Sequence, residues 1–339
     1  MTYNPITALI LFFAFLVLLY VVFRPVKGWF WILKKNFNSN EKVIIEDILK
    51  QLYHFENSGN KVDMKTLVQV LDFNNNRIVE AIKKMTINDL IYFESDVLKL
   101  TETGREYALR IVRVHRLWER YLADRTGFSK TEWHDRAELM EHQLSHDETE
   151  KLAAHLGNPK FDPHGDPIPT RTGKMAQVNG VELPLLAVNT IGRITHIEDE
   201  PDVIYKQILA ENIHIGSFIR VTENNATRIV FESEGEEFKL APIVAANLTV
   251  SPIEKEVVLE DNIARLSSLK EDESAKIIGI SKESRGESRR RLLDLGFVKG
   301  ADIKIDLLNP LGEPHAYLIK GTSIALRKNQ APKILIKKV

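Results

Sequence analysis

The C-terminal half of the chain contains an internal repeat, which constrains the fold more than any other feature of the sequence. ILAENIHIG, residues 208–216, aligns with LLDLGFVKG, residues 292–300, and each copy is followed by alternating polar and apolar residues. Repetition at a fixed period indicates a duplicated structural unit. Short strands, one helical turn and a glycine-led turn in each copy are typical of a small β-barrel. We therefore expect two similar β modules, over residues 181–255 and 273–339, joined by a linker over 256–272.

Composition excludes several classes of protein. The chain has 339 residues, of which 27% are charged, with a net charge of -1. This length predicts more than one folded unit. The sequence contains no cysteine, so a disulfide framework, an iron–sulfur cluster, a thiolate zinc site and a cysteine nucleophile are all excluded. It also lacks a nucleophile elbow, a phosphate-binding loop and an HExxH motif. We expect that the chain is not an enzyme.

The first 40 residues predict a membrane anchor and a juxtamembrane linker. Residues 6–23 carry no charge, and a helix of this length rises roughly 27 Å, close to a hydrocarbon core of ~30 Å. Arg24 and Lys27 follow at once, so the positive-inside rule predicts a single pass through the inner (cytoplasmic) membrane, with the N-terminus outside and the remaining domains in the cytoplasm. A cleaved signal peptide is the first alternative, but no basic segment precedes the stretch and no small-residue cleavage site follows it. A buried core helix is the second.

Residues 41–101 have the pattern of a winged helix-turn-helix. Helical periodicity is present in 41–58, 63–72 and 74–89, and LIYFESDVLKLT, which begins at Leu90, alternates as a β-hairpin does. Three helices followed by a wing are typical of this DNA-binding motif. A small helical bundle that ends in a hairpin gives the same pattern.

The third of these helices, NNNRIVEAIKKM, is the predicted recognition helix. Its polar N-terminal residues are suited to contact bases or phosphates, together with nearby lysines: Asn74, Asn75, Asn76, Arg77, Lys65, Lys83 and Lys84. Residues 41–101 nevertheless contain ten acidic against eight basic side chains, the opposite of the usual balance in a DNA-binding domain. A degenerate motif kept as a structural platform is therefore the alternative.

Histidine and carboxylate side chains recur at helical spacing between residues 102 and 160. His134, Glu138, Glu141 and His142 stand at i, i+4, i+7 and i+8 and thus share one helical face. A second pair, His115 with Glu119, has the i, i+4 spacing on the preceding helix. Two such stripes can converge on a divalent cation, and nitrogen and oxygen donors suit Mn²⁺, Fe²⁺ or Zn²⁺. Solvated surface pairs are the alternative.

The segments LTETGREYALRIVRVHRLWERYLADRTG and WHDRAELMEHQLS, with the later LGNPKFDPHGDPIP, resemble the iron-dependent repressor family of the diphtheria toxin repressor and manganese transport regulator type. The resemblance covers residues 41–170. It implies a winged helix-turn-helix, a helical metal-binding and dimerisation domain over 102–160 and a linker over 161–180. The second β module resembles ferrous iron transport protein A, an SH3-like domain, and the first resembles the SH3-like third domain of long repressors.

By position, the resemblance places the six histidine and carboxylate residues above on metal-ligand positions. Glu138 and Asp47 stand where the iron regulators have Cys or Met, as in manganese-type members, whereas Lys50 replaces a further carboxylate of that type. His164 and Asp166 lie in a proline-punctuated loop, for which we favour a structural role. Glu200 and Asp202 are weaker candidates for ligands from the β module.

These features together predict an α+β chain with a transmembrane helix, a winged helix-turn-helix, a helical domain and two SH3-like barrels. The predicted function is a dimeric, membrane-anchored regulator of iron and manganese homeostasis that binds operator DNA when Mn²⁺ or Fe²⁺ is bound, with Zn²⁺ also compatible. The alternative is a membrane-side metal sensor that regulates a ferrous iron permease without binding DNA.

Overall fold

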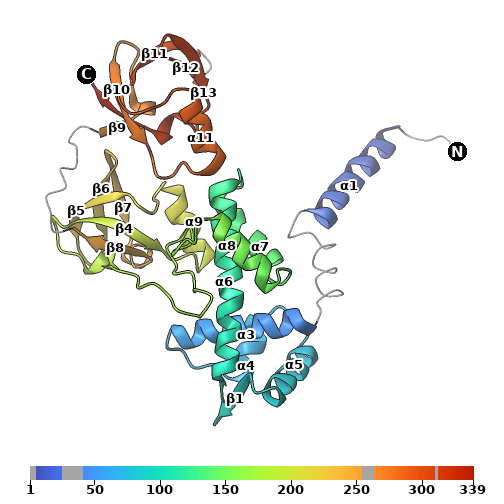
Figure 1. The fold of residues 1–339 in the computed structure, drawn as a ribbon. Helices are drawn as coiled ribbons and strands as arrows, with labels where there is room; N and C mark the ends of the chain where they lie inside the picture. Colours follow the sequence, from blue (N-terminus) through green and yellow to red (C-terminus); the bar gives the residue numbers. More distant parts are fainter. Residues whose placement is uncertain (1–4, 25–40, 254–262, 310–311) are drawn as a thin grey trace. The chain divides into compact units, whose positions relative to one another are not determined.

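The computed structural model describes residues 5–24, 41–253, 263–309 and 312–339 (Figure 1). The contacts within the chain divide it into two compact units. The first comprises the segments Met1–His115, Asp135–Thr149 and Pro169–Lys174, and the second comprises Arg116–His134, Glu150–Ile168 and Met175–Val339. Helices and sheets are both present, which confirms the predicted α+β class.

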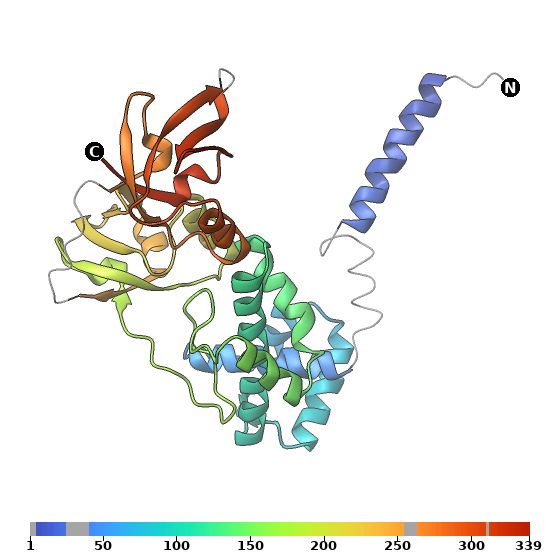
Figure 2. The same ribbon diagram turned by 45° about the horizontal axis from the view of Figure 1, so that its top comes forward.

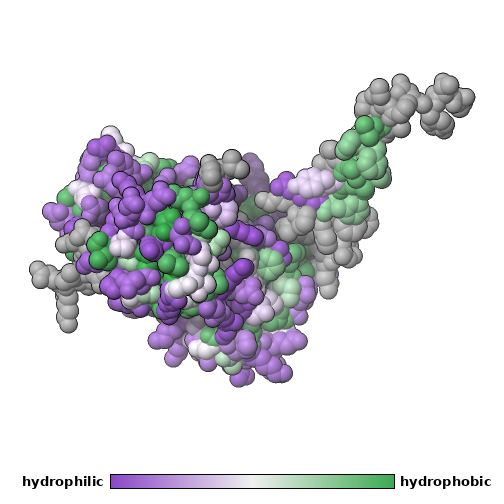
Figure 3. All heavy atoms as spheres, turned by 90° about the horizontal axis from the view of Figure 1, so that it is seen from above, coloured by the Kyte–Doolittle hydropathy of each residue, from purple (hydrophilic) through white to green (hydrophobic). Residues whose placement is uncertain are grey.

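The N-terminal apolar stretch forms helix α1 (Pro5–Phe23), which is coloured hydrophobic in Figure 3. Across the described ranges, no helix combines the length and the apolar character needed to cross a membrane. The predicted anchor over residues 6–23, and the inner-membrane localisation derived from it, are therefore wrong. The prediction rested on the apolar composition of the stretch, whereas spanning requires a helix that is both long and apolar enough over its described residues. The predicted linker over 25–40 lies outside the described residues.

A three-helix motif with a two-stranded wing follows. Its elements are α3 (Glu41–Asn57), α4 (Met64–Val70), α5 (Asn75–Ile87), β1 (Ile91–Glu94) and β2 (Val97–Leu100). The strands pair antiparallel, with Ile91 opposite Leu100. Two short polar side chains begin the helices: Asp63 accepts a hydrogen bond from the Thr66 N–H at the start of α4, and Asn74 accepts one from the Asn76 N–H at the start of α5.

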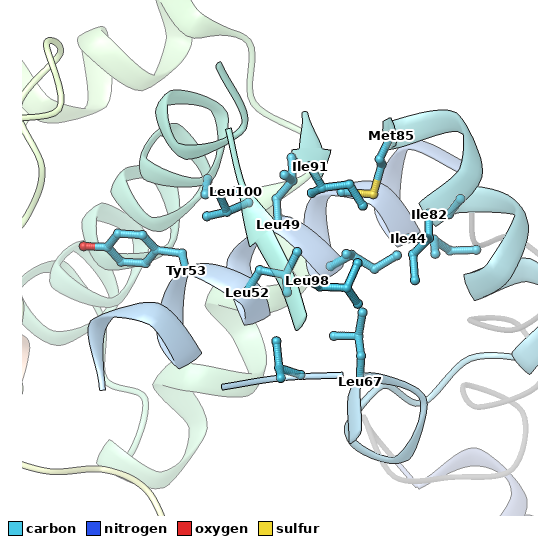
Figure 4. Packing of buried hydrophobic residues seen from close by; sticks show 14 of the residues in the cluster. Ile44, Leu49, Leu52, Tyr53, Leu67, Ile82, Met85, Ile91, Leu98 and Leu100 are labelled. Atoms are coloured by element: carbon cyan, nitrogen blue, oxygen red, sulfur yellow. The ribbon is translucent and has the colours of Figure 1, made fainter. Parts of the chain in front are cut away.

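One hydrophobic core holds these elements together. Figure 4 shows Leu98 of β2 beside Leu49 and Leu52 of α3, with Ile82 and Met85 contributed by α5. All five side chains are at most 2% exposed. Burial of side chains of this size contributes about 1.5–3 kcal/mol each before the loss of conformational entropy is counted. The position of α5 is thus fixed by its packing against α3.

The segment after the wing is helical, as predicted. It contains α6 (Glu102–Arg125), α7 (Lys130–Glu141) and α8 (His146–His155). Thr101 starts α6, since its hydroxyl accepts a hydrogen bond from the Gly104 N–H. Ser145 does the same for α8, where its hydroxyl accepts from the Glu148 N–H and donates to the Glu148 carboxylate.

Each β module consists of one six-stranded sheet with short helical turns. The first module contains β3 (Val181–Glu182), η1 (Leu183–Leu185), β4 (Ile191–Ile197), α9 (Asp202–Ala210), β5 (Phe218–Asn224), β6 (Ile229–Ser233), β7 (Glu236–Leu240), α10 (Pro242–Ala245) and β8 (Leu248–Pro252). The second contains β9 (Ile263–Arg265), η2 (Leu266–Ser268), β10 (Ser274–Ile280), α11 (Gly286–Asp294), β11 (Asp302–Asn309), β12 (Gly312–Ile319), β13 (Thr322–Leu326), η3 (Ala331–Lys333) and β14 (Ile334–Lys338). Figure 2 shows both modules from a second direction.

The two sheets have the same topology. Their strand orders are β3-β8-β4-β5-β6-β7 and β9-β14-β10-β11-β12-β13. This correspondence agrees with the sequence repeat, including the buried pairs Leu248 with Ile334 and Val250 with Ile336. Among the described residues, the first and the last strand of each sheet do not pair with each other, so closure of the sheet into a barrel stays a prediction. β9 and η2 lie within residues 256–272, which were predicted to be a linker. β9 forms because it pairs with β14, and its three residues are too few to show a periodic pattern in the sequence.

Candidate metal centres and nucleic-acid interface

A first cluster of potential ligands lies within the first unit, where α3 meets the end of α7. Donor atoms of Asp47, Glu141 and His142 lie within 4.8 Å of one another. His142 Nε2 is 3.1 Å from Asp47 Oδ1 and 3.5 Å from Glu141 Oε1, while its Nδ1 is 2.7 Å from Glu46 Oε2. We call Asp47, Glu141 and His142 the first centre. The imidazole and carboxylate donors are those preferred by Mn²⁺, Fe²⁺ and Zn²⁺.

Charge is concentrated at this centre. Burial lowers the pKa of His142, but hydrogen bonds to Asp47 and Glu46 outweigh burial and raise it to about 9. Burial raises the pKa of Glu141, but the charge of Lys50 and the hydrogen bond to His115 outweigh this effect and hold the pKa of Glu141 at about 2. The Glu141 carboxylate is therefore ionised and attracts a cation to the centre.

Lys50 supplies one such cation from within the chain. Its Nζ donates to Glu141 Oε2 at 2.8 Å and lies 3.2 Å from His115 Nδ1, and His115 Nδ1 is itself 2.5 Å from Glu141 Oε2. Burial lowers the pKa of Lys50, and the Glu141 charge raises it above its usual value. An ammonium group thus contacts two residues that were predicted as metal ligands.

A second cluster lies within the second unit. His134 Nδ1 is 3.5 Å from Glu119 Oε1 and 3.8 Å from Asp199 Oδ2, and His164 Nε2 is 3.8 Å and 4.0 Å from the same two oxygens. Glu119 and His164 are buried, whereas the His134 side chain is 44% exposed. We call Glu119, His134, His164 and Asp199 the second centre. Its exposed histidine leaves the centre open to solvent.

The second centre fits a metal ion by two observations. Among the residues that the structure describes, the buried Nε2 of His164 has no hydrogen-bond partner, although it points at two carboxylate oxygens. A buried polar atom without a partner is costly. In addition, donors about 2.1 Å from a tetrahedral ion stand about 3.4 Å apart, and the four histidine–carboxylate distances here are 3.5–4.0 Å.

The loop that carries His164 is fixed against β4. The Ile197 N–H donates to the His164 carbonyl at 2.9 Å, and Asp162 Oδ1 accepts from the backbone N–H groups of His164 and Asp166. Gly165 has φ +95, and a Cβ at this position would lie 2.2 Å from the Thr195 carbonyl oxygen. Only glycine permits this close approach in the left-handed region. The loop and the strand thereby position His164 near Asp199.

Several predicted ligands are thus brought together, but in two sets. Asp47, Glu141 and His142 form the first centre with His115 beside them, whereas Glu119 and His134 belong to the second. Glu138 belongs to none of the three-donor groups found among the described residues, and its charge acts on Lys50.

Sequence reasoning missed two residues of the second centre. His164 was assigned a structural role, and Asp199 was passed over for its neighbours Glu200 and Asp202. The available signal was the histidine followed by Gly165, since a glycine beside a potential ligand indicates a close backbone approach.

The predicted DNA-contacting residues lie on α4 and α5 and at the residue before α5. Asn75, Asn76, Lys65 and Lys83 are exposed and make no side-chain hydrogen bond or ion pair within the described part of the chain. The Asn74 side chain caps α5 instead, and Lys84 Nζ is 2.5 Å from Glu41 Oε1. The face therefore offers four uncommitted polar side chains to a nucleic acid.

Comparisons with known proteins agree with this arrangement. Residues 101–170 match the family model for the metal binding and dimerisation domain of iron dependent repressors, and residues 264–338 match the FeoA domain. The chain is thus similar to iron dependent repressors over its helical segment and to FeoA domains at its C-terminal end.

Individual relatives match parts of the chain. The iron-dependent repressor IdeR of Mycobacterium tuberculosis is 34% identical over 125 residues, which are 37% of this chain and 54% of that protein. A probable metal transport system membrane protein of Chlamydia trachomatis is 45% identical over 75 residues, 22% of this chain and 17% of that protein. The chain thus spans about half, or less, of these two relatives.

Among solved structures, a manganese-dependent transcriptional repressor in complex with manganese is 29% identical, with a TM-score of 0.55. The match covers 61% of this chain and 99% of that one. Several of these relatives are named as repressors, in agreement with the expectation that the chain is not an enzyme.

Proposed function

We propose that this protein is a metal-dependent transcriptional repressor whose operator binding is controlled by a divalent cation at the first centre, while a cation at the second centre stabilises the fold. The observation that carries the proposal is the contact of His142 with Glu46 and Asp47, since it joins potential metal ligands to α3 of the winged helix motif. The cofactor is a divalent transition metal, in agreement with relatives named for iron or solved with manganese.

Asp47, Glu141 and His142 would hold the ion at the first centre. A bound ion supplies a cross-link between α3 and the end of α7. Because α3 packs against α5 through one buried core, a restraint on α3 also restrains the recognition helix. Metal occupancy would thereby favour the conformation that binds DNA, as a population shift requires.

Glu119, His134, His164 and Asp199 would hold the ion at the second centre. These residues come from α6, α7, the 156–168 loop and the segment after β4, so an ion there would tie the first β module to the helices of the same unit. The second centre would act on stability more than on base recognition, because none of its ligands belongs to the winged helix motif.

Operator binding would use a homodimer. Regulators with a winged helix motif read half-sites related by the two-fold axis of the dimer. Asn75, Asn76, Lys65 and Lys83 would contact each half-site. Dimer mass in analytical ultracentrifugation, with metal and with chelator, tests this part of the proposal.

The test of the proposal is metal-dependent DNA retention by the full chain. Fluorescence anisotropy would follow binding to duplexes from its own upstream region and from metal-transport genes, with Mn²⁺, Fe²⁺ or a chelator. We expect sequence-selective binding with metal and its loss in His142→Ala. Metal binding without any DNA retention would contradict the proposed repressor function. It would favour the alternative function, a metal sensor that regulates a ferrous iron permease without binding DNA.

Variants of the DNA face provide a second readout. Lys83→Ala should weaken binding to all duplexes and reduce the salt slope by about 1, as loss of one phosphate contact does. Lys151→Ala, at an exposed position of α8, is the matched control. Equal effects of the two variants would show that α5 is not the DNA-contacting helix.

A further inference from the structure

The FeoA domain contains a basic groove that neither metal centre uses. It has a volume of about 570 Å³ and lies between α11 and the turn that precedes η3. Arg290 and Arg291 line it from α11, and Arg327 lines it from the turn. Its volume falls in the range of roughly 300–1,000 Å³ that is typical of small-molecule sites.

The three guanidinium groups are exposed and uncommitted. None of them makes an ion pair or a side-chain hydrogen bond with any other described residue, although the carboxylates of Glu287 and Asp294 also line the groove. The positive charges gathered in one groove repel each other, so the binding of an anion between them is energetically favourable. Arginine is suited to phosphate in particular, because its planar fork donates two parallel hydrogen bonds to phosphate oxygens.

The backbone that carries these arginines is fixed. Leu292, between them and the domain core, is 2% exposed, and Ala331 after the turn is 7% exposed. Within the turn, the Arg327 N–H donates to Gln330 Oε1 at 2.9 Å and the Gln330 N–H donates to the Arg327 carbonyl. The groove therefore exists before any ligand binds, which lowers the entropic cost of binding.

We propose that this groove binds an oligophosphate, most simply the phosphates of a nucleoside di- or triphosphate. Three forks can hold two or more adjacent phosphate groups, and the amides of Asn329 and Gln330, which also line the groove, offer hydrogen bonds to a polar base or sugar. A concave site of this size suits a mononucleotide better than a DNA duplex, whose phosphates lie on a convex surface. The FeoA domain thereby gives the protein an input besides metal.

The experiment is isothermal titration calorimetry on the full chain with ADP, GDP and pyrophosphate as probes. A chelator keeps both metal centres free of ions, so that phosphate binding cannot occur through a metal. We expect saturable binding, weakened about tenfold by Arg291→Gln and by Arg327→Gln. Arg327→Lys should be intermediate, because it keeps the charge and loses the fork. Lys304→Gln, an exposed site on β11 outside the groove, should change affinity less than twofold.

The probes also identify the source of the phosphate. Tighter binding of ADP or GDP than of pyrophosphate supports a nucleotide, and equal affinity supports an inorganic oligophosphate. The proposal is overturned if no probe binds at about 1 mM, or if Lys304→Gln weakens binding as much as the arginine variants. It is also overturned if only duplex DNA binds through these arginines. Far-UV circular dichroism verifies that each variant is folded.

Discussion

At the scale of single residues, two lysines with different surroundings illustrate how environment determines the role of an ammonium group. Lys50 is compensated, since Glu141 accepts two hydrogen bonds from it. Lys130 is half-buried, and burial lowers its pKa to about 8, with the charges of Arg285 and Lys333 adding to the effect. The first lysine is thus paired with a carboxylate, whereas burial disfavours the charged form of the second.

Lys50→Glu should add a metal to the first centre. The substitution removes the ammonium group between His115 and Glu141 and supplies a carboxylate in its place, so a second ion can bind there. We expect the number of Mn²⁺ ions per chain to rise by one, measured by equilibrium dialysis and elemental analysis. Lys50→Met removes the charge without adding a ligand and should leave the number unchanged. A rise with both variants would contradict this role of Lys50.

Lys130→Met should stabilise the protein at pH 7 by about 1–3 kcal/mol, since it removes a poorly solvated charge. Below pH 8 the lysine is charged in both states and only the folded state bears the cost. Between pH 8 and 10.5 the folded lysine loses its proton first, so wild type gains stability and the difference between the proteins shrinks. Urea unfolding at pH 7 and 10 measures both effects, and exposed Lys151→Met should show neither.

At the scale of elements, the loop that ends in PHGDPIP shows how backbone geometry places a ligand. Its hydrogen bonds to β4 and the contact of Gly165 with Thr195 position His164 toward Glu119 and Asp199. The geometry of the second centre therefore depends on Gly165, which is not itself a ligand.

Gly165→Ala should displace this loop and weaken the second centre selectively. The added Cβ would meet the Thr195 carbonyl oxygen at 2.2 Å in a left-handed conformation, which costs more than about 1 kcal/mol. We expect at least tenfold weaker metal binding at the second centre, resolved by titration in a His142→Ala background, and unchanged affinity at the first, resolved in a His164→Ala background. Gly157→Ala, with φ +75 and nothing within 4 Å, is the control for backbone strain alone. Equal losses in both variants would refute the steric explanation.

At the scale of the whole molecule, each unit contains one centre, so metal should stabilise each unit separately. Binding at a hundredfold excess over Kd adds about 2.7 kcal/mol to the unit that holds the ion. Donors from distant segments of the chain meet only in the folded state, which is why the ion distinguishes folded from unfolded protein.

Removal of metal by a chelator should therefore lower the melting temperature in calorimetry. We expect His142→Ala and His164→Ala each to lose part of the metal-induced shift, and the double variant to lose all of it. A full shift in the double variant would place the metal elsewhere in the chain.

Much of this protein was determined by the sequence itself. Local patterns predicted the winged helix motif, the long helical segment, the duplicated modules and most of the first centre, because periodicity and the i, i+4 spacing are properties of contiguous residues. Tertiary structure decided the rest. Whether Glu119 joins His164 and Asp199, whether Lys50 reaches His115, and whether three arginines line one groove all depend on segments tens of residues apart. The anchor prediction failed for a similar reason. The apolar composition of residues 6–23 can be read from the sequence, but membrane spanning depends on the length and apolar character of the helix that forms.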